Sequence, residues 1–313
     1  RGYFSLDDPL VKLIPEAKGT NKENLVVKDI LTHKAGLEPW VPFFLATLKD
    51  QKPSDEFYSK KPNEYLNSQV ARDLYNNENY EDVMLKTILE TGLGQPKYKY
   101  SDLGYYLFKR YVESTLHEAI ENYTNDEFYE PLGATTLGYL PRQRFAEDRL
   151  VPTEHDRYFR YQLIRGYVHD QGAAMTGGVG GHAGLFSNAN DLAKLMQMYL
   201  QGGYYGGKRY LKETTLKEFT KCEFCKEDNR RGIGFDKPQI SGPGPACDCV
   251  SKLSFGHTGF TGTIAWADPD ENIVYVFLSN RVYPDAENKK LITTSVRTNI
   301  QEEIYRSLNT YEQ

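Results

Sequence analysis

The sequence predicts an α/β protein of the α+β type, in which an antiparallel sheet flanked by helices joins a mainly helical region. Two observations lead to this prediction. Up to about residue 221, apolar residues recur at helical spacing between long irregular connections. After about residue 230, the chain carries short runs rich in β-branched and aromatic residues, which are typical of strands. We therefore expect one domain over residues 1–313, with a helical region at 24–221 and a sheet region with a closing helix at 222–313.

Four helices are expected in the first region, at residues 27–32, 80–93, 103–116 and 191–200. The last shows the pattern most clearly, because its apolar side chains fall on one face of a helix. These are Leu192, Leu195, Met196 and Tyr199, at i, i+3, i+4 and i+7. Two glycines at 202–203 then end the helix.

The second region predicts strands at 232–235, 263–267 and 273–279. Residues 268–272 read Asp-Pro-Asp-Glu-Asn, a turn cluster, so the last two strands should form an antiparallel hairpin. A closing helix follows at 288–308. Its apolar residues, Ile292, Val296, Ile300 and Ile304, share one face, which we expect to pack on the sheet.

Composition excludes several classes of protein. Aromatic residues make up 13% of the 313 residues, which argues against a disordered chain. A net charge of -5 argues against a nucleic-acid partner, which usually meets a basic surface. No apolar run approaches the roughly 18 residues of a transmembrane helix. The chain opens on Arg1 without an initiator Met or a signal peptide, so we expect it to be the C-terminal part of a longer polypeptide.

Three segments carry residues suited to chemistry. Residues 98–104 form a polar stretch before a predicted helix, where Asp102 either caps the helix or serves a site. Residues 177–184 hold five glycines in eight positions, which indicates tight bends or the close approach of another group. Residues 256–262 surround His257 with small residues, a setting in which backbone N–H groups can donate to an oxyanion.

Taken in order, short motifs along the chain resemble the serine β-lactamase and penicillin-binding-protein superfamily, in its esterase and amidase branch. The resemblance covers nearly the whole chain. The motifs are Leu6-Asp7-Asp8-Pro9, the Leu-Thr-His segment at 30–37, Tyr100-Ser101-Asp102, Pro131-Leu132-Gly133, Gly184-Leu185-Phe186-Ser187 with Asp191-Leu192, and His257-Thr258-Gly259. The resemblance implies a β-lactamase/transpeptidase-like fold and hydrolysis through an acyl-enzyme on a serine.

The resemblance also implies roles for single residues. Tyr100 would be the phenolic partner that helps deprotonate the serine, for which its pKa must fall from about 10. Asp102 stands where the family has Asn, which adds a charge and removes a donor.

The segment at residues 256–262 would supply half of the oxyanion hole. His257 stands where the family has the Lys of Lys-Thr-Gly, so the site is less permanently positive. Thr258 and Gly259 complete this motif. The N–H of Phe260, one residue further, would form half of the oxyanion hole.

The family's nucleophile, the serine of Ser-x-x-Lys, has no counterpart in residues 1–313, because no serine here has a lysine three positions later. The motif normally lies just before the Asp-Asp-Pro segment, which begins here at residue 7. We therefore expect the nucleophile and the first strands of the sheet to lie upstream of residue 1, and residues 1–313 alone to be inactive.

A narrower resemblance concerns residues 152–154, 165–170 and 178–184. They resemble a subgroup found fused behind, or encoded beside, family 3 β-N-acetylglucosaminidases, some of whose relatives are N-acetylmuramyl-L-alanine amidases. This implies a muropeptide or similar small-molecule substrate and a glycoside hydrolase domain as partner. His169, Asp170 and His182 would line the substrate pocket, or the two histidines only pin loops; Trp40 is a further pocket candidate.

The four cysteines, Cys222, Cys225, Cys247 and Cys249, all fall between residues 222 and 249. A four-thiolate structural zinc site is one interpretation, and one or two disulfides or free thiols are the other. The catalytic chemistry requires no cofactor on either interpretation.

The resemblance favours the bacterial periplasm or cell envelope as location. A competing hypothesis is a non-catalytic module that binds muropeptides or a partner chain on the same fold.

Overall fold

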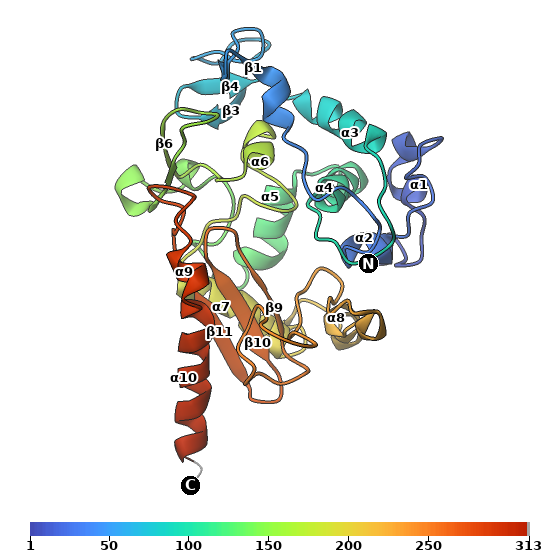
Figure 1. Cartoon of the computed structure of the whole chain (residues 1–313), viewed down its shortest axis with the longest axis vertical. Coiled ribbons are helices and arrows are strands. Elements are labelled where there is room, and N and C mark those ends of the chain that lie inside the picture. The colour runs from blue at the N-terminus through green and yellow to red at the C-terminus, as the bar shows by residue number, and fades with distance from the viewer. Residues whose placement is uncertain (312–313) are drawn as a thin grey trace. The chain divides into compact units, whose positions relative to one another are not determined.

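The computed structural model describes residues 1–311, with side chains to residue 308; the last two residues of the predicted domain lie outside this range. The chain folds into two compact units, drawn together in Figure 1 and considered separately below. The first unit comprises residues 1–124 and 138–186. The second comprises residues 125–137 and the chain from residue 187 onward.

The first unit is mainly helical, as expected. Its helices are α1 (Leu10–Leu13), α2 (Val27–Leu31), α3 (Tyr80–Glu90), α4 (Leu103–Leu116), α5 (Ile120–Thr124) and α6 (Gln171–Met175). Three of them confirm the helices predicted at 27–32, 80–93 and 103–116. Met84 and Ile88 of α3 are buried, as is Leu107 of α4, so the apolar faces of these helices form the core.

Three two-stranded antiparallel sheets complete the first unit. They are β1 (Leu48–Lys49) with β2 (Lys52–Pro53), β3 (Ser68–Ala71) with β4 (Leu74–Asn76), and β5 (Pro152–His155) with β6 (Leu163–Arg165). Each is a short hairpin rather than part of a larger sheet.

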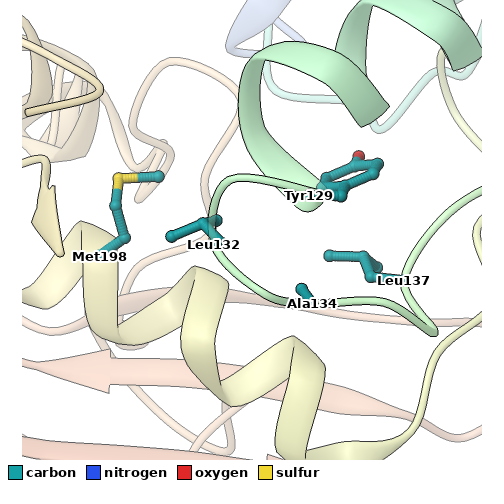
Figure 2. Packing of buried hydrophobic residues seen from close by; sticks show 5 residues of the cluster. All are labelled: Tyr129, Leu132, Ala134, Leu137 and Met198. Atoms are coloured by element: carbon teal, nitrogen blue, oxygen red, sulfur yellow. The ribbon is translucent and has the colours of Figure 1, made fainter. Parts of the chain in front are cut away.

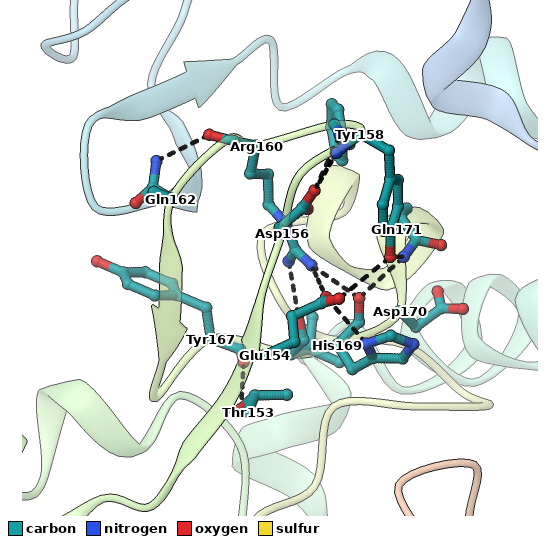
Figure 3. Close-up of polar contacts among 12 residues, drawn as sticks. Thr153, Glu154, Asp156, Tyr158, Arg160, Gln162, Tyr167, His169, Asp170 and Gln171 are labelled. Carbon is teal, nitrogen blue, oxygen red and sulfur yellow. Dashed lines mark hydrogen bonds and ion pairs between the residues drawn. The ribbon is translucent and has the colours of Figure 1, made fainter. Parts of the chain in front are cut away.

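A buried ionic network fastens the chain between β5 and helix α6 (Figure 3). Arg160 has no exposed side-chain surface and donates to Asp156 at 2.8 Å and to Glu154 at 2.8 Å. The same guanidinium donates to the carbonyls of Val168 and His169, at 2.6 and 2.9 Å. One side chain therefore fixes the backbone that leads directly into helix α6.

The second unit contains the main sheet. The helices of this unit are α7 (Ala189–Leu200), α8 (Glu213–Thr220), α9 (Lys290–Thr293) and α10 (Val296–Tyr311). The main sheet consists of β9 (Phe255–Thr258), β10 (Ile264–Asp268) and β11 (Ile273–Phe277), and β7 (Tyr204–Tyr205) and β8 (Lys208–Arg209) form a separate pair. The order β11-β10-β9 is antiparallel throughout. The predicted hairpin is confirmed, because Trp266 of β10 pairs with Tyr275 of β11.

Helix α7 supports this sheet, as Figure 1 shows. Its Met196 packs with Phe255 of β9 and Ala267 of β10 in one buried cluster. A second cluster joins α7 to residues 129–137, with Met198 among Tyr129, Leu132, Ala134 and Leu137 (Figure 2). Residues 125–137 therefore belong to the second unit although they precede part of the first.

Two sequence expectations about the second unit are wrong. Residues 232–235 form a bend rather than a strand, in which the Gly232 N–H donates to the Phe235 carbonyl, and strand pairing begins only with the bridge from Asp236 to Gly256. The closing helix breaks at Ser295, which has a φ of 52°.

The closing helix also meets the sheet through a different face from the one predicted. Arg297 donates to the Thr263 carbonyl, and Tyr305 donates to Asp268. Ile300 and Ile304 are 40% and 37% exposed. The helix therefore contacts the sheet through polar groups spaced eight residues apart, and periodicity alone could not show this.

The compact units divide the chain at other points than residue 221. Helices α7 and α8, assigned from sequence to the helical region, lie in the same unit as the sheet. The predicted domain bounds remain a prediction.

Candidate active site

The Tyr100 segment is held in place by backbone hydrogen bonds before helix α4. The Ser101 N–H donates to Nδ1 of His33 at 3.1 Å, and the Asp102 N–H donates to the Pro39 carbonyl at 3.1 Å. The Tyr100 ring lies on the buried His33 ring, with 4.3 Å between centroids. Tyr100 is nevertheless 40% exposed, so its position is fixed while part of the side chain faces solvent.

Asp102 occupies the residue before helix α4, but within the described chain its carboxylate accepts no N–H of that helix. It is hydrogen-bonded to Tyr100 instead. Burial raises the pKa of Asp102, and the charge of Asp170 adds to this rise, while His182 and Tyr100 oppose it. The side chain of Asp102 therefore does not cap helix α4, and its role in a site stays a prediction.

Asp170 and His182 form a second pair close to Asp102. Asp170 precedes helix α6 and accepts the Ala173 N–H at 2.7 Å, which makes it the cap of that helix. The same oxygen, Oδ1, lies 2.9 Å from Nε2 of His182. Burial works to raise the pKa of Asp170, but His182, the Ala173 N–H and His169 together outweigh burial and lower it.

Tyr106 covers this pair, with its ring stacked on His182 at 4.2 Å between centroids. Burial, together with the charges of Asp170 and Asp102, raises the pKa of Tyr106 well above its usual value. Tyr106 therefore stays protonated, and Tyr100 is the phenol of the two with solvent access.

His169 and Trp40 take separate places in the first unit. Nδ1 of His169 lies 2.9 Å from the buried Glu154, so this ring is anchored in the Arg160 network (Figure 3). Trp40 is 46% exposed and contacts Phe44. Because the neighbouring Pro39 accepts the Asp102 N–H, Trp40 follows a residue bonded to the cluster. Both histidines, 169 and 182, thus hold carboxylates, and a role in lining a substrate pocket stays a prediction.

The remaining predicted residues lie on and after strand β9 of the second unit. His257 pairs with Ala265 of β10, and Thr258 pairs with Ile264. The Gly259 N–H donates to the Thr263 carbonyl at 2.9 Å and closes a tight turn into β10. Phe260 lies in that turn and is 64% exposed, with the Arg281 guanidinium 4.8 Å from its ring centroid.

Arg231 is the main residue that sequence reasoning missed. The pair Arg230-Arg231 was interpreted as a solvated surface, but Arg231 is only 1% exposed and lies 3.0 Å from Nε2 of His257. Asp236 pairs with both arginines. Tyr106 and His33 were also not assigned to the site. Their signal was the motif context, since each lies within or beside a segment already quoted for the resemblance.

The four cysteines form two short-range disulfides, Cys222–Cys225 and Cys247–Cys249. Across residues 1–311, no group of three or more His, Cys, Asp or Glu side chains is arranged to hold a metal ion. This pairing matches the disulfide interpretation of the cysteine cluster, and a zinc site stays an untested prediction.

Similarity to known proteins decides the family. A family model described as Beta-lactamase matches residues 1–297. The chain belongs to the beta-lactamase family. Its members are serine hydrolases, and the resemblance and the β-lactamase/transpeptidase-like fold expected from the sequence are thereby confirmed.

Relatives within and around the beta-lactamase family agree with this assignment. A protein named "Putative D-alanyl-D-alanine carboxypeptidase" from Escherichia coli K12 is 32% identical over 92% of this chain. A protein of the same name from Salmonella agona is 30% identical over 93% of it. The chain spans 66% of the length of each of these relatives.

Solved structures share the fold at low identity. A penicillin-binding protein homologue from Caulobacter crescentus has a TM-score of 0.55 at 18% identity, covering 88% of this chain and 71% of its own. A variant of simvastatin synthase from Aspergillus terreus has a TM-score of 0.61 at 15% identity, covering 98% and 75%. In the described part of the chain, no helix is both long and apolar enough to cross a membrane.

Proposed function

We propose that this member of the beta-lactamase family contributes most of an acyl hydrolase that cleaves an amide or ester bond in cell-wall peptides. The observation that carries the proposal is the Tyr100–Asp102 motif, held beside Asp170 and His182 in a chain that matches the family over residues 1–297. The relative named "Putative D-alanyl-D-alanine carboxypeptidase" supports a peptide as substrate. The choice of muropeptides as the specific class rests on the narrower resemblance of residues 152–154, 165–170 and 178–184. With such a substrate, we propose that the protein acts in the bacterial cell envelope and that its partner is a glycoside hydrolase acting on the same polymer.

The proposed reaction has two steps. A serine oxygen attacks the carbonyl carbon, its proton passes to a base that includes Tyr100, and the leaving amine or alcohol departs with a proton. The developing oxyanion accepts hydrogen bonds from the backbone N–H groups of the serine and of Phe260. Water then attacks the acyl-enzyme, which releases the acid and restores the serine hydroxyl. Tyr100 is the candidate for this role because it stands at the motif position and is 40% exposed, whereas Tyr106 is buried.

Residues 1–313 hold no Ser-x-x-Lys sequence, so we propose that this stretch by itself forms no acyl-enzyme. The test is to treat it with a fluorescent penicillin and a fluorophosphonate, beside a polypeptide extended by its natural upstream coding sequence. Labelling of one serine in the extended protein alone is expected. Labelling of residues 1–313, or of neither protein while both are folded, would overturn the proposal.

Tyr100→Phe in the extended protein tests the base. We expect loss of acylation by about 100-fold or more, as for removal of a general base. Tyr65→Phe is the matched control, because Tyr65 is 69% exposed and lies outside the cluster. Equal acylation by Tyr100→Phe and the control would remove Tyr100 from the mechanism.

A non-catalytic binding module is the second candidate, favoured by the missing Ser-x-x-Lys sequence. It predicts that residues 1–313 bind a muropeptide although no serine is labelled in either protein. Calorimetric titration with N-acetylmuramyl-L-alanyl-D-isoglutamine separates the two candidates.

A further inference from the structure

Both ring nitrogens of His257 have partners whose polarity is fixed. Nδ1 lies 2.7 Å from the Thr258 carbonyl oxygen, which can only accept. Nε2 lies 3.0 Å from a terminal nitrogen of Arg231, which can only donate. Nδ1 must therefore carry the proton, and Nε2 must present its lone pair to the guanidinium.

Arg231 is built to hold this position. Its side chain is 1% exposed, and its guanidinium pairs with Asp236 at 3.3 Å. Its backbone is fixed on both sides, because its N–H donates to the Asn229 side chain at 3.0 Å and its carbonyl accepts the Glu223 N–H at 3.1 Å. The arginine is thus an ordered part of the second unit, and its contact with His257 does not depend on a mobile side chain.

Several charged side chains lie close to His257. Arg230 and Arg231 supply two cations, and Asp236, which pairs with both, supplies one anion. On the neighbouring strand, Ala265 faces His257 and brings no charge. The guanidinium of Arg231 cannot lose its proton at ordinary pH, so its positive charge beside the ring is permanent.

We propose that Arg231 is a positioning residue that keeps His257 as a neutral imidazole with its proton on Nδ1, and that the arginine supplies the permanent positive charge of this part of the site. His257 is then a neutral, polar group beside the charge of Arg231. It acts neither as a general base nor as a cation that titrates. The second half of the proposal rests on the proposed function, since it assumes that β9 borders the substrate. The first half is a property of the folded chain.

The direction in which the pKa of His257 is shifted agrees with a neutral imidazole. Burial and the charge of Arg231 lower the pKa of His257, and Arg230 adds to this, while the Thr258 carbonyl and Asp236 oppose it. Loss of the Arg231 charge should therefore raise the pKa of His257.

The test is long-range ¹⁵N–¹H NMR of the histidine rings in residues 1–313, with His257→Gln used to assign the signal. The expected spectrum shows the Nδ1–H tautomer at pH 7 and a titration midpoint below about 6.5. Arg231→Gln should raise that midpoint by about one pH unit or more. Arg230→Gln is the matched control, because Arg230 pairs with the same Asp236 and has a smaller influence on the pKa of His257 than Arg231, so it should shift the midpoint less.

Two results would overturn the proposal. One is an Nε2–H tautomer in the unaltered protein, a measurement that needs no variant and so survives misfolding of Arg231→Gln. The other is a midpoint that Arg231→Gln leaves unchanged; if the glutamine variant fails to fold, Arg231→Met, which also removes the charge, takes its place.

The outcome is separable from the proposed function. If the extended protein is active, its acylation rate should show no limb from His257 between about pH 5 and 8, and Arg231→Gln should introduce one. An inactive protein with the Nδ1–H tautomer would refute the hydrolase and keep the role of Arg231.

Discussion

Replacement of Arg160 by Met is the sharpest test of how the first unit is stabilised. The guanidinium has no exposed surface and binds two carboxylates with at most 2% exposure, at 2.8 Å each. Removing one partner of a buried ion pair costs about 3–5 kcal/mol, because the remaining charge is left in a medium of low polarity. Met fills much of the same volume without charge, so the loss measures the ionic contacts rather than a cavity.

The assay is urea unfolding followed by circular dichroism. With a slope of about 3 kcal/mol per M, a loss of that size lowers the midpoint by more than about 1 M. Hydrogen exchange should place the loss in residues 152–175, since these carry the contacts of Arg160. Arg306→Met is the matched control, because Arg306 is 63% exposed and its ion pairs should contribute less than about 1 kcal/mol.

The pH dependence gives an independent check through Asp156. Burial works to raise the pKa of Asp156, but Arg160 and two backbone N–H groups outweigh burial and lower it. This stabilisation of the unaltered protein is therefore present above the unfolded pKa of about 3.9 and is lost as pH falls through the folded value. In Arg160→Met, burial raises the pKa of Asp156 without the opposing cation. Acidification then protonates this buried carboxylate and removes part of the cost of burying its charge. The stability difference should narrow from pH 7 to pH 4; a constant difference, or one under about 1 kcal/mol at pH 7, would refute this account.

Three further substitutions test other parts of the fold by the same unfolding assay. Leu137→Ala should cost about 2–5 kcal/mol, because Leu137 is 1% exposed in the cluster of Figure 2. Gly172→Ala should cost about 1–3 kcal/mol, because the added methyl group would overlap the Tyr106 hydroxyl. Tyr305→Phe should cost about 1–3 kcal/mol, since the buried Asp268 loses a donor at 2.8 Å.

Two of these substitutions, Tyr305→Phe and Gly172→Ala, have a matched control. Ile304→Ala should be nearly neutral, because Ile304 is 37% exposed on the same helix as Tyr305. Gly94→Ala should be tolerated, since its methyl group would lie 3.6 Å from the nearest atom. A control as costly as its partner would show that the assay reports general disturbance of the chain instead of the named contact.

The sequence predicted the fold through periodicity and motifs, and it failed where a contact joins distant residues. Helix α4 has the bounds expected from its pattern, Leu103–Leu116. The inward face of α10 was missed because Arg297 and Tyr305 pack through polar atoms, which no hydrophobic pattern reveals. Hydrogen bonds to the sheet, rather than the apolar face of the helix, therefore determine which side of α10 faces inward.

The candidate site was predicted by motif and completed by geometry. Tyr100, Asp102 and His257 were assigned to the candidate site because they stand at motif positions. Arg231 could not be found in this way, since two adjacent arginines in a polar stretch are indistinguishable from a solvated surface. Only folding places residue 231 beside residue 257, through the bridge that pairs Asp236 with Gly256.

Asp170 shows how local folding and chemistry can share one atom. Its Oδ1 accepts a hydrogen bond from the Ala173 N–H in the first turn of helix α6 and lies 2.9 Å from Nε2 of His182. The start of the helix and the orientation of the imidazole therefore cannot be adjusted independently. Substitutions at residues 170 and 182 should be strongly non-additive, and a double-mutant cycle is needed before any loss of activity at Asp170 is attributed to catalysis.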